Sequence, residues 1–242
     1  MYKKLFLNKK AVLFGLDNVL SPITEHLISG VRSVQIKHGA ATFLVRELVA
    51  QGYSLKDIWE EIKRDKDIDL KEHVDTLVQE SVVEIVKELT QDSLDPVEGF
   101  YALAAELKID RQLRLGLATS LEKAVVDKVL DSLDLTDVFD TAVTAEDSGM
   151  FFNPYKKALE NLKLNRKDAV AFENTLLGAQ FAHDAKLDLV IVGQRSFEES
   201  EYPNEVIEFV DNYSTFVGQT DIDPLELLKE RANQLQQETN LP

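Results

Sequence analysis

The segment AVLFGLDNVL, residues 11–20, places an acidic residue shortly after an apolar stretch. The apolar residues Ala11–Phe14 predict a buried strand, and Asp17 follows where a tight acidic loop is expected. A carboxylate in such a loop is a candidate for acid–base catalysis or metal binding. Gly15, however, stands two residues before Asp17 and brings no side chain. Whether the protein is an enzyme therefore depends on what this site has kept and what it has lost.

The composition excludes several classes of ligand and chemistry. The chain has 242 residues, 44% of them hydrophobic, which suffices for one large domain or a domain with an insertion. Its 43 acidic and 27 basic residues give a net charge of −16, so we expect no nucleic-acid ligand and no binding to an anionic membrane. With no cysteine there are no disulfides, Cys-ligated metals or thiol nucleophiles, and the four histidines do not fall at metal-ligand spacing.

The first residues, MYKKLFLNKK, are basic and precede an apolar run. That run is too short for the core of a signal peptide, and no small-residue cleavage site follows it. No stretch of the sequence approaches the apolar length of a membrane span. We therefore expect a cytoplasmic protein.

Short apolar runs alternate with helical patterns along most of the chain. The runs lie at residues 11–16, 113–119, 139–145, 169–174 and 187–193. Helical periodicity is found at residues 97–107, 121–133, 154–162 and 176–186. Strands that alternate with helices of this length predict an α/β fold, with a parallel sheet covered by helices on both faces.

Residues 21–94 show helical patterns and no convincing strand. The clearest helices are expected at Ala41–Gln51, from Ser54 onward, and at Val74–Leu89. An all-helical insertion after the first strand predicts a cap over the carboxyl edge of the sheet, where α/β folds bind ligands. We therefore expect residues 1–20 and 95–242 to form the core and residues 21–94 to form a helical cap.

The tail predicts one more amphipathic helix, at Asp223–Gln237, with Leu225, Leu228, Ala232 and Leu235 on one side. Such a helix either docks on its own domain, the more common arrangement, or joins two subunits. Within the insertion, Trp59 has helical spacing and is expected to belong to the core of the cap rather than to a ligand platform.

Four segments in a fixed order carry a resemblance to a known family. They are Phe14-x-Leu16-Asp17-x-Val19-Leu20, Asp95-Pro96-Val97-Glu98-Gly99 after the helical insertion, Ala118-Thr119-Ser120 at a strand end, and Phe172-Glu173-Asn174-Thr175 before a helix. Together they resemble the haloacid dehalogenase (HAD) superfamily, in particular its β-phosphoglucomutase-like phosphatases with a helical cap. The resemblance covers nearly the whole chain and implies a Rossmann-like core.

The resemblance also implies a mechanism. Active members carry two aspartates two residues apart, of which the first attacks phosphorus and the second is a general acid/base. A Ser or Thr binds the phosphate, a Lys offsets its charge, and an acidic residue holds Mg²⁺. The covalent aspartyl-phosphate divides a difficult transfer into two steps, and the cations offset charge on the equatorial oxygens.

Carried over to this chain, the set of catalytic positions is incomplete. Gly15 stands at the nucleophile position, whereas Asp17 keeps the acid/base position. The phosphate-binding position is Thr119, with Ser120 beside it. At the metal position the acidic pair of the family reads Glu173-Asn174, with an amide in place of the second carboxylate.

The lysine of the family is missing, since residues 129–155 contain neither Lys nor Arg. Gly149-Met150-Phe151-Phe152-Asn153-Pro154 stands in its place, and Lys156 or Lys157 is the nearest substitute cation. A phosphate dianion without Mg²⁺ and lysine loses roughly three compensating charges, each worth about 4 kcal/mol at an effective dielectric constant near 20. The loss of the two aspartates matches the loss of the lysine and Mg²⁺, because two aspartates without these cations would repel each other in one cleft.

We therefore interpret the chain as a pseudoenzyme that binds an unknown protein partner or small molecule and needs no cofactor. A first alternative is a divergent HAD-type phosphatase, hydrolase or phosphomutase, with Asp17 acting alone, Lys156 or Lys157 as the cation, and Mg²⁺ as cofactor. A second is a metal-free binder of a neutral small molecule near Phe151 and Phe152. Fold alone does not decide among them.

The retained residues also have structural interpretations. Asp17 can stabilise the turn that follows the strand, and this role is favoured over catalysis. Thr119 and Ser120 are expected as N-caps of the following helix, whose free amides could also hold an anion. Glu173 is expected to lie in a solvated loop.

Overall fold

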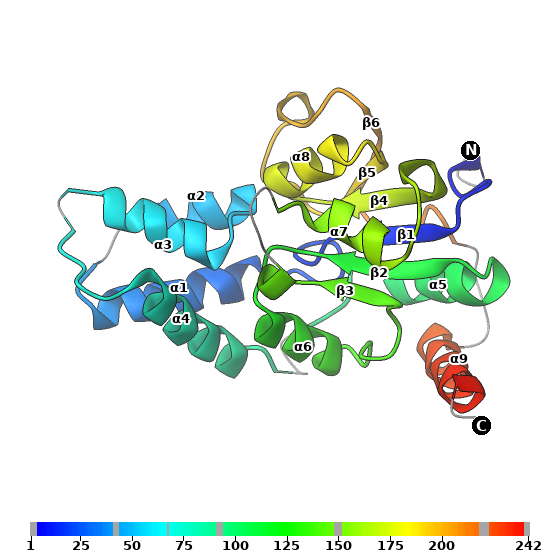
Figure 1. Ribbon diagram of the computed structural model, residues 1–242, viewed down its shortest axis with the longest axis horizontal. Helices are drawn as coiled ribbons and strands as arrows, with labels where there is room; N and C mark the ends of the chain where they lie inside the picture. Colours follow the sequence, from blue (N-terminus) through cyan, green and yellow to red (C-terminus); the bar gives the residue numbers. More distant parts are fainter. Residues whose placement is uncertain are drawn as a thin grey trace.

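The computed structural model describes residues 4–40, 44–66, 68–90, 94–147, 152–217 and 223–239, with the backbone alone for residues 235–239. Within these ranges a six-stranded sheet forms the centre of the molecule, with strand order β3-β2-β1-β4-β5-β6, and every pair of neighbouring strands is parallel (Figure 1). The strands are β1 (Ala11–Phe14), β2 (Arg114–Ala118), β3 (Thr141–Val143), β4 (Ala169–Glu173), β5 (Asp188–Val192) and β6 (Val206–Val210). The predicted parallel α/β fold is confirmed.

The sheet is covered on both faces because its central strands are apolar except for a charged residue at one end of β2, β4 and β5. In β1, Val12 and Phe14 point into one hydrophobic core, whereas Ala11 and Leu13 point into the other. The first core is completed by α5 (Phe100–Ala105), α6 (Lys123–Ser132) and α9 (Pro224–Thr239). The second is completed by α7 (Pro154–Asn161) and α8 (Leu176–Asp184). This two-sided burial explains why the strands read as continuous apolar runs.

Between β1 and α5, the described residues form four helices: α1 (Thr24–Lys37), α2 (Leu44–Gln51), α3 (Leu55–Arg64) and α4 (Val74–Glu88). They gather at one end of the sheet (Figure 1), and they contact the core through α2 against α8 and α4 against α6. Trp59 is fully buried among them, and its indole donates a hydrogen bond to Ser81 Oγ over 2.9 Å. The helical nature of this insertion agrees with the sequence. Its exact boundaries and its role as a cap stay predictions.

The tail helix α9 packs against α5 of its own domain, with Leu228 buried and Lys229 paired with Asp134 over 2.9 Å. It therefore docks on the core in the arrangement that the sequence favoured. The Leu235 side chain and residues 41–43 of the expected helix Ala41–Gln51 lie outside the described side chains and residues. None of the helices within the described ranges is long and apolar enough to cross a membrane.

Two elements were not predicted. Strand β6 has the sequence VIEFV, in which Glu208 interrupts the apolar run and Ile207 is half exposed, as an edge strand permits. Helix α1 contains Gly30, which weakens a helical pattern. That glycine is required by packing, because a Cβ there would lie 2.3 Å from Ile85 Cγ1 on α4.

Candidate functional site

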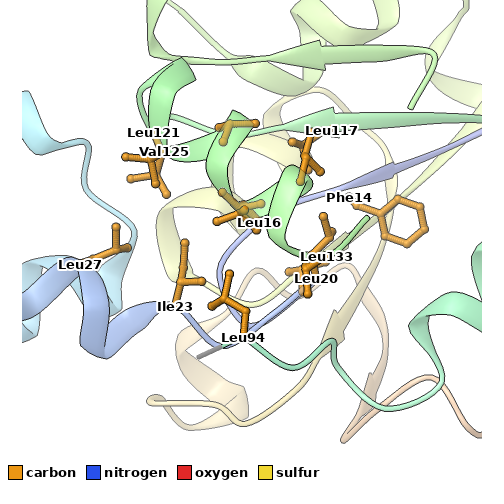
Figure 2. Close-up of a cluster of buried hydrophobic side chains, with 14 of the residues drawn as sticks. Phe14, Leu16, Leu20, Ile23, Leu27, Leu94, Leu117, Leu121, Val125 and Leu133 are labelled. Carbon is orange, nitrogen blue, oxygen red and sulfur yellow. The ribbon is translucent and has the colours of Figure 1, made fainter. Parts of the chain in front are cut away.

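The loop after β1 is anchored by apolar side chains. Figure 2 shows Leu16, Leu20 and Ile23 among Leu117, Leu121 and Leu133, and all six are buried. Because these contacts hold the loop from β1 to α1, Asp17 is fixed at the carboxyl end of the strand. The polar residues of the candidate site are therefore positioned by the hydrophobic core beneath them.

Asp17 is 8% exposed, and both of its oxygens accept hydrogen bonds at the start of α1. Its Oδ1 accepts from the backbone N–H of Ile23 over 2.9 Å, and its Oδ2 accepts from Thr24 Oγ1 over 2.7 Å. Burial raises the pKa of this carboxyl from 3.8 to about 6, against the lowering effect of those hydrogen bonds. Asp17 thus stabilises the turn and the first turn of the helix, as its structural interpretation expected.

Gly15 lies at the end of β1, where its N–H donates to the Phe172 carbonyl over 2.9 Å. A Cβ on this residue would lie 2.6 Å from Glu173 Oε1 and 2.9 Å from Glu173 Cδ. Real side chains do not approach so closely, so a residue larger than glycine would require Glu173 to move. The place where a nucleophile's side chain would begin is therefore occupied by another carboxylate.

Glu173 ends β4 and is 6% exposed, so it does not lie in a solvated loop as we expected. Its Oε2 accepts from the Asn174 N–H over 2.5 Å, the Thr175 N–H over 2.8 Å and Thr175 Oγ1 over 3.2 Å. A Cβ on Gly178 would lie 2.0 Å from Glu173 Oε1, so the carboxylate is enclosed by two glycines, Gly15 and Gly178. Burial raises its pKa from 4.5 to about 7.

Asn174 uses its side-chain amide to join two strands. Its Nδ2 donates to the backbone carbonyls of Val192 and Gln194 over 2.7 and 3.0 Å. The backbone carbonyl of Asn174 accepts from the Tyr202 hydroxyl over 2.7 Å. A carboxylate at this position would face two carbonyl oxygens with no proton to share. The amide is therefore suited to its surroundings and fixes the loop after β4 to the end of β5.

Thr119 and Ser120 do not cap α6, contrary to the expectation. The helix begins at Lys123 with Glu122 at the N-cap position, and Thr119 Oγ1 instead accepts from the Leu121 N–H over 3.2 Å. The N–H of Lys123 donates to both oxygens of Glu146, at 3.0 and 2.8 Å. This end of the helix therefore already binds a carboxylate of the protein, which competes with any external anion.

The two substitute cations lie away from this site. Lys156 is exposed on α7, and Lys157 lies 3.9 Å from Glu160 on the same helix. Phe151, Gly149 and Met150, which stand where the family's lysine segment falls, lie outside the described residues.

A small cavity of about 40 Å³ lies where these residues meet. Its lining residues with polar side chains are Asp17, Tyr53, Thr119, Ser120, Tyr155, Glu173 and Thr175. The turn between α2 and α3 closes it, since a Cβ on Gly52 would lie 2.5 Å from Thr175 Oγ1. Within the described part of the chain, no Lys, Arg or His lines the cavity. Small-molecule sites typically have about 300–1,000 Å³, so this space suits a few waters rather than a sugar phosphate.

These residues do not fit Mg²⁺ as they stand. The described residues contain no group of three or more His, Cys, Asp or Glu side chains able to hold a metal ion. Both oxygens of Asp17 and one of Glu173 already accept hydrogen bonds within the protein. The described side chains, as they are hydrogen-bonded here, therefore offer Mg²⁺ no set of free carboxylate ligands.

Sequence reasoning missed three residues that shape the site. Tyr155 is fully buried. Its hydroxyl makes no hydrogen bond of ordinary geometry among the described residues, but it lies close enough to the Glu173 carboxylate for the two groups to interact electrostatically. Burial and this negative neighbour raise the Tyr155 pKa far above its usual value. Gly52 and Gly178 make the close contacts described above. In the sequence, these three residues are marked only by their types, a glycine or an aromatic residue near the expected motifs, and nothing there indicates that they contact the site.

Comparison with known proteins places the chain in a family. The family model of haloacid dehalogenase-like hydrolases matches residues 12–192. CbbY from Rhodobacter sphaeroides, solved in complex with phosphate, is 19% identical with a TM-score of 0.74, over 85% of this chain and 95% of that one. β-Phosphoglucomutase from Clostridium difficile is 19% identical with a TM-score of 0.71, over 94% and 98% of the two chains. No curated protein sequence gives a significant match.

The chain belongs to the haloacid dehalogenase-like hydrolase family. It shares the α/β fold of CbbY and β-phosphoglucomutase, so the resemblance read from the sequence is confirmed for the superfamily and the fold. At such low identity the structural likeness concerns the fold alone, and function has to be argued from the site.

Proposed function

We propose that this protein is a non-catalytic member of its family, which keeps the hydrolase fold and acts by binding a protein partner or a small molecule. The observation that carries the proposal is the position of Glu173, whose carboxylate occupies the space where a side chain at residue 15 would begin. With glycine at the nucleophile position and no cation lining the described cavity, a phosphoryl group would meet two carboxylates and no compensating charge.

The size and closure of the site support the same proposal. The cavity is about 40 Å³, and Gly52 of the helical insertion lies directly against Thr175. We propose that residues 21–94 act as a cap held against the core, which leaves the outer surfaces of the molecule and other pockets for binding.

The alternative is a divergent phosphatase or hydrolase. The raised pKa of Asp17, about 6, favours it, because such a carboxyl can transfer protons near neutral pH. In this alternative Lys156 or Lys157 would have to turn toward the cavity and Mg²⁺ would have to bind.

Phosphatase assays separate the two. Purified protein is incubated with p-nitrophenyl phosphate and a panel of sugar phosphates, with and without Mg²⁺, beside Asp17→Asn prepared in the same way. We expect no turnover beyond that of the variant. Mg²⁺-dependent turnover that is present in the wild type and absent from Asp17→Asn would overturn the proposal, whereas equal turnover in both samples identifies a contaminating enzyme.

A further inference from the structure

A second and larger pocket lies between the helical insertion and the core. Its volume is about 550 Å³, within the range of small-molecule sites. It is lined by α3 and α4 on the insertion side, and by residues around the start of α6, the short helix Ala145–Asp147, and α8 on the core side. Ser120 and Phe181 line both this pocket and the small cavity, so the two are neighbours.

The charge of the pocket is strongly negative. Among the described residues that line it, four are acidic and one is basic: Asp57, Asp75, Glu122 and Glu146, against Lys56. Two of these carboxylates have partners, since Glu146 accepts from the Lys123 N–H and Asp57 accepts from Ser54 Oγ over 2.6 Å. These bonds fix the two negative charges at the pocket wall.

Glu122 is the residue that distinguishes this pocket from an ordinary acidic surface. It is 7% exposed, and its Oε2 has no hydrogen-bond donor within the part of the chain that the structure describes. Glu122 occupies the N-cap position of α6 but makes no capping hydrogen bond, because Glu146 accepts from the helix amide instead. A buried carboxylate oxygen without a donor is costly, and a ligand that donates to it would remove that cost.

The surroundings of Glu122 favour a cation over a neutral donor. Burial, together with the negative charges of Glu146 and Asp57, raises its pKa from 4.5 to about 7, against the lowering effect of a hydrogen bond with its own backbone. The carboxylates of Glu146 and Asp57 therefore lie close enough to Glu122 to act on its charge. A positive charge placed there would interact favourably with all three groups.

The pocket also has an apolar side, formed by Val78, Phe152, Leu177 and Phe181. Val78 is buried, and both phenylalanines are partly buried against the second core. A ligand that fills the pocket therefore contacts acidic groups at one end and apolar side chains, two of them aromatic, at the other.

We propose that this pocket binds a small organic amine, whose ammonium group donates to Glu122 and whose apolar part packs against Phe152 and Phe181. The inference goes beyond the proposed function, because it concerns a different pocket and does not depend on whether the neighbouring cavity has lost phosphoryl transfer.

Three probes that share a phenyl ring test the charge requirement: 2-phenylethylamine, the neutral 2-phenylethanol and the anionic 3-phenylpropionate. Binding to the full-length protein is followed by NMR chemical-shift titration at neutral pH. We expect the amine to bind at least about tenfold more tightly than the alcohol, as one charge-assisted hydrogen bond predicts. We expect the acid to bind more weakly than either.

Three variants, each of which removes one negative charge, test the place of binding. Glu122→Gln keeps the shape of the side chain and should weaken amine binding about tenfold. Glu84→Gln on α4 removes the same charge outside this pocket and should leave the affinity unchanged, which controls for general attraction to an acidic protein. Asp57→Asn, at an exposed residue of the pocket, should weaken binding severalfold without disturbing a buried group.

The proposal is overturned if amine and alcohol bind equally, or if Glu122→Gln and Glu84→Gln behave alike. If Glu122→Gln fails to fold, Asp57→Asn against Glu84→Gln decides in the same way. None of these measurements uses Asp17 or a phosphate ester, so their failure and the failure of the proposed function are distinguishable.

Discussion

At the scale of single residues, the candidate site is closely packed around Gly15. Gly15 leaves the space that the Glu173 carboxylate fills, and Gly178 closes it from the other side. Asn174 donates to two carbonyls that a carboxylate could only repel. The replacements therefore support one another, and changing one position back should disturb its neighbours.

Replacing Gly15 tests this dependence. Gly15→Ala should lower the free energy of unfolding by about 1–3 kcal/mol, because the new Cβ overlaps Glu173 Oε1 at 2.6 Å. Gly15→Asp should cost more, by about 3–5 kcal/mol in total, since it adds an unpaired charge next to a buried carboxylate. Urea denaturation measures both values. Wild-type stability in Gly15→Asp would show that the Glu173 side chain leaves this space at little cost, and the observation that carries the proposed function would then be lost.

The raised pKa of Glu173 predicts a pH-dependent stability. Because the carboxyl has a pKa of about 7 when folded and an ordinary value of 4.5, the folded state holds the extra proton between these values. Its stabilising contribution is complete below about pH 4.5 and is lost as the pH rises through about 7. Glu173→Gln removes this dependence, so its stability relative to wild type should increase by about 3 kcal/mol from pH 5 to pH 8.

The measurement is a urea titration of both proteins at the two pH values. Asp17 and Glu122 have pKa values raised in the same direction, to about 6 and about 7, so some dependence should remain in Glu173→Gln. Glu160→Gln, at an exposed position of α7, is the matched control and should follow the wild type. A constant difference between Glu173→Gln and wild type across pH would contradict a buried carboxyl that ionises late.

The sequence predicted where the candidate residues lie in the fold but not which contacts they make. The order of the motifs placed Gly15, Asp17, Thr119 and Glu173 at strand ends, where the structure also has them. It could not show that Glu173 turns into the space above Gly15, because that depends on Thr175 and Gly178, which lie on the loop and helix after β4. It also misplaced the start of α6, since Glu146, distant in sequence, supplies the carboxylate that a local N-cap would have supplied.

At the scale of elements, the apolar content of the sequence predicts the strands, but it does not predict how the helices pack against one another. The four central strands, β2, β1, β4 and β5, follow from their apolar runs, which two cores bury from both sides. Strand β6 lies at the sheet edge, and Glu208 interrupts the apolar run that would mark it. Helix α1 was missed because Gly30 weakens the local signal, although the reason for that glycine is a contact with α4, which lies more than forty residues further along the chain.

The contact between α1 and α4 gives a prediction opposite to helix propensity. In an ordinary helix interior, Gly→Ala stabilises by about 0.5–1 kcal/mol. At Gly30 the new Cβ would lie 2.3 Å from Ile85 Cγ1 and 3.0 Å from its backbone nitrogen, so Gly30→Ala should destabilise by about 1–3 kcal/mol. Thermal or urea unfolding measures the change.

A double-mutant cycle isolates the contact. Ile85→Ala removes the Cγ1 atom, so Gly30→Ala should cost less in that background than in the wild type. Additive effects of the two substitutions would show that the helices do not meet at this point.

At the scale of the whole molecule, the net charge of −16 acts against compactness. Most of the acidic residues are on the surface, where salt screens their repulsion with a Debye length of about 10 Å at 0.1 M. Raising NaCl from low concentration to about 0.5 M should therefore stabilise the protein by roughly 1 kcal/mol, a few degrees in Tm.

The same measurement distinguishes general screening from a metal site when NaCl is compared with MgCl₂ at equal ionic strength. If Asp17 and Glu173 keep the hydrogen bonds described here, Mg²⁺ should add only what any divalent cation adds to an acidic surface, and CaCl₂ should match it. The additional stabilisation by MgCl₂ over NaCl should also be the same in Asp17→Asn as in the wild type, because the Asp17 carboxylate already accepts hydrogen bonds from Ile23 and Thr24. A stabilisation specific to Mg²⁺ that disappears in Asp17→Asn would mean that the loop after β1 rearranges to bind the metal, and the divergent phosphatase would then be favoured over the pseudoenzyme.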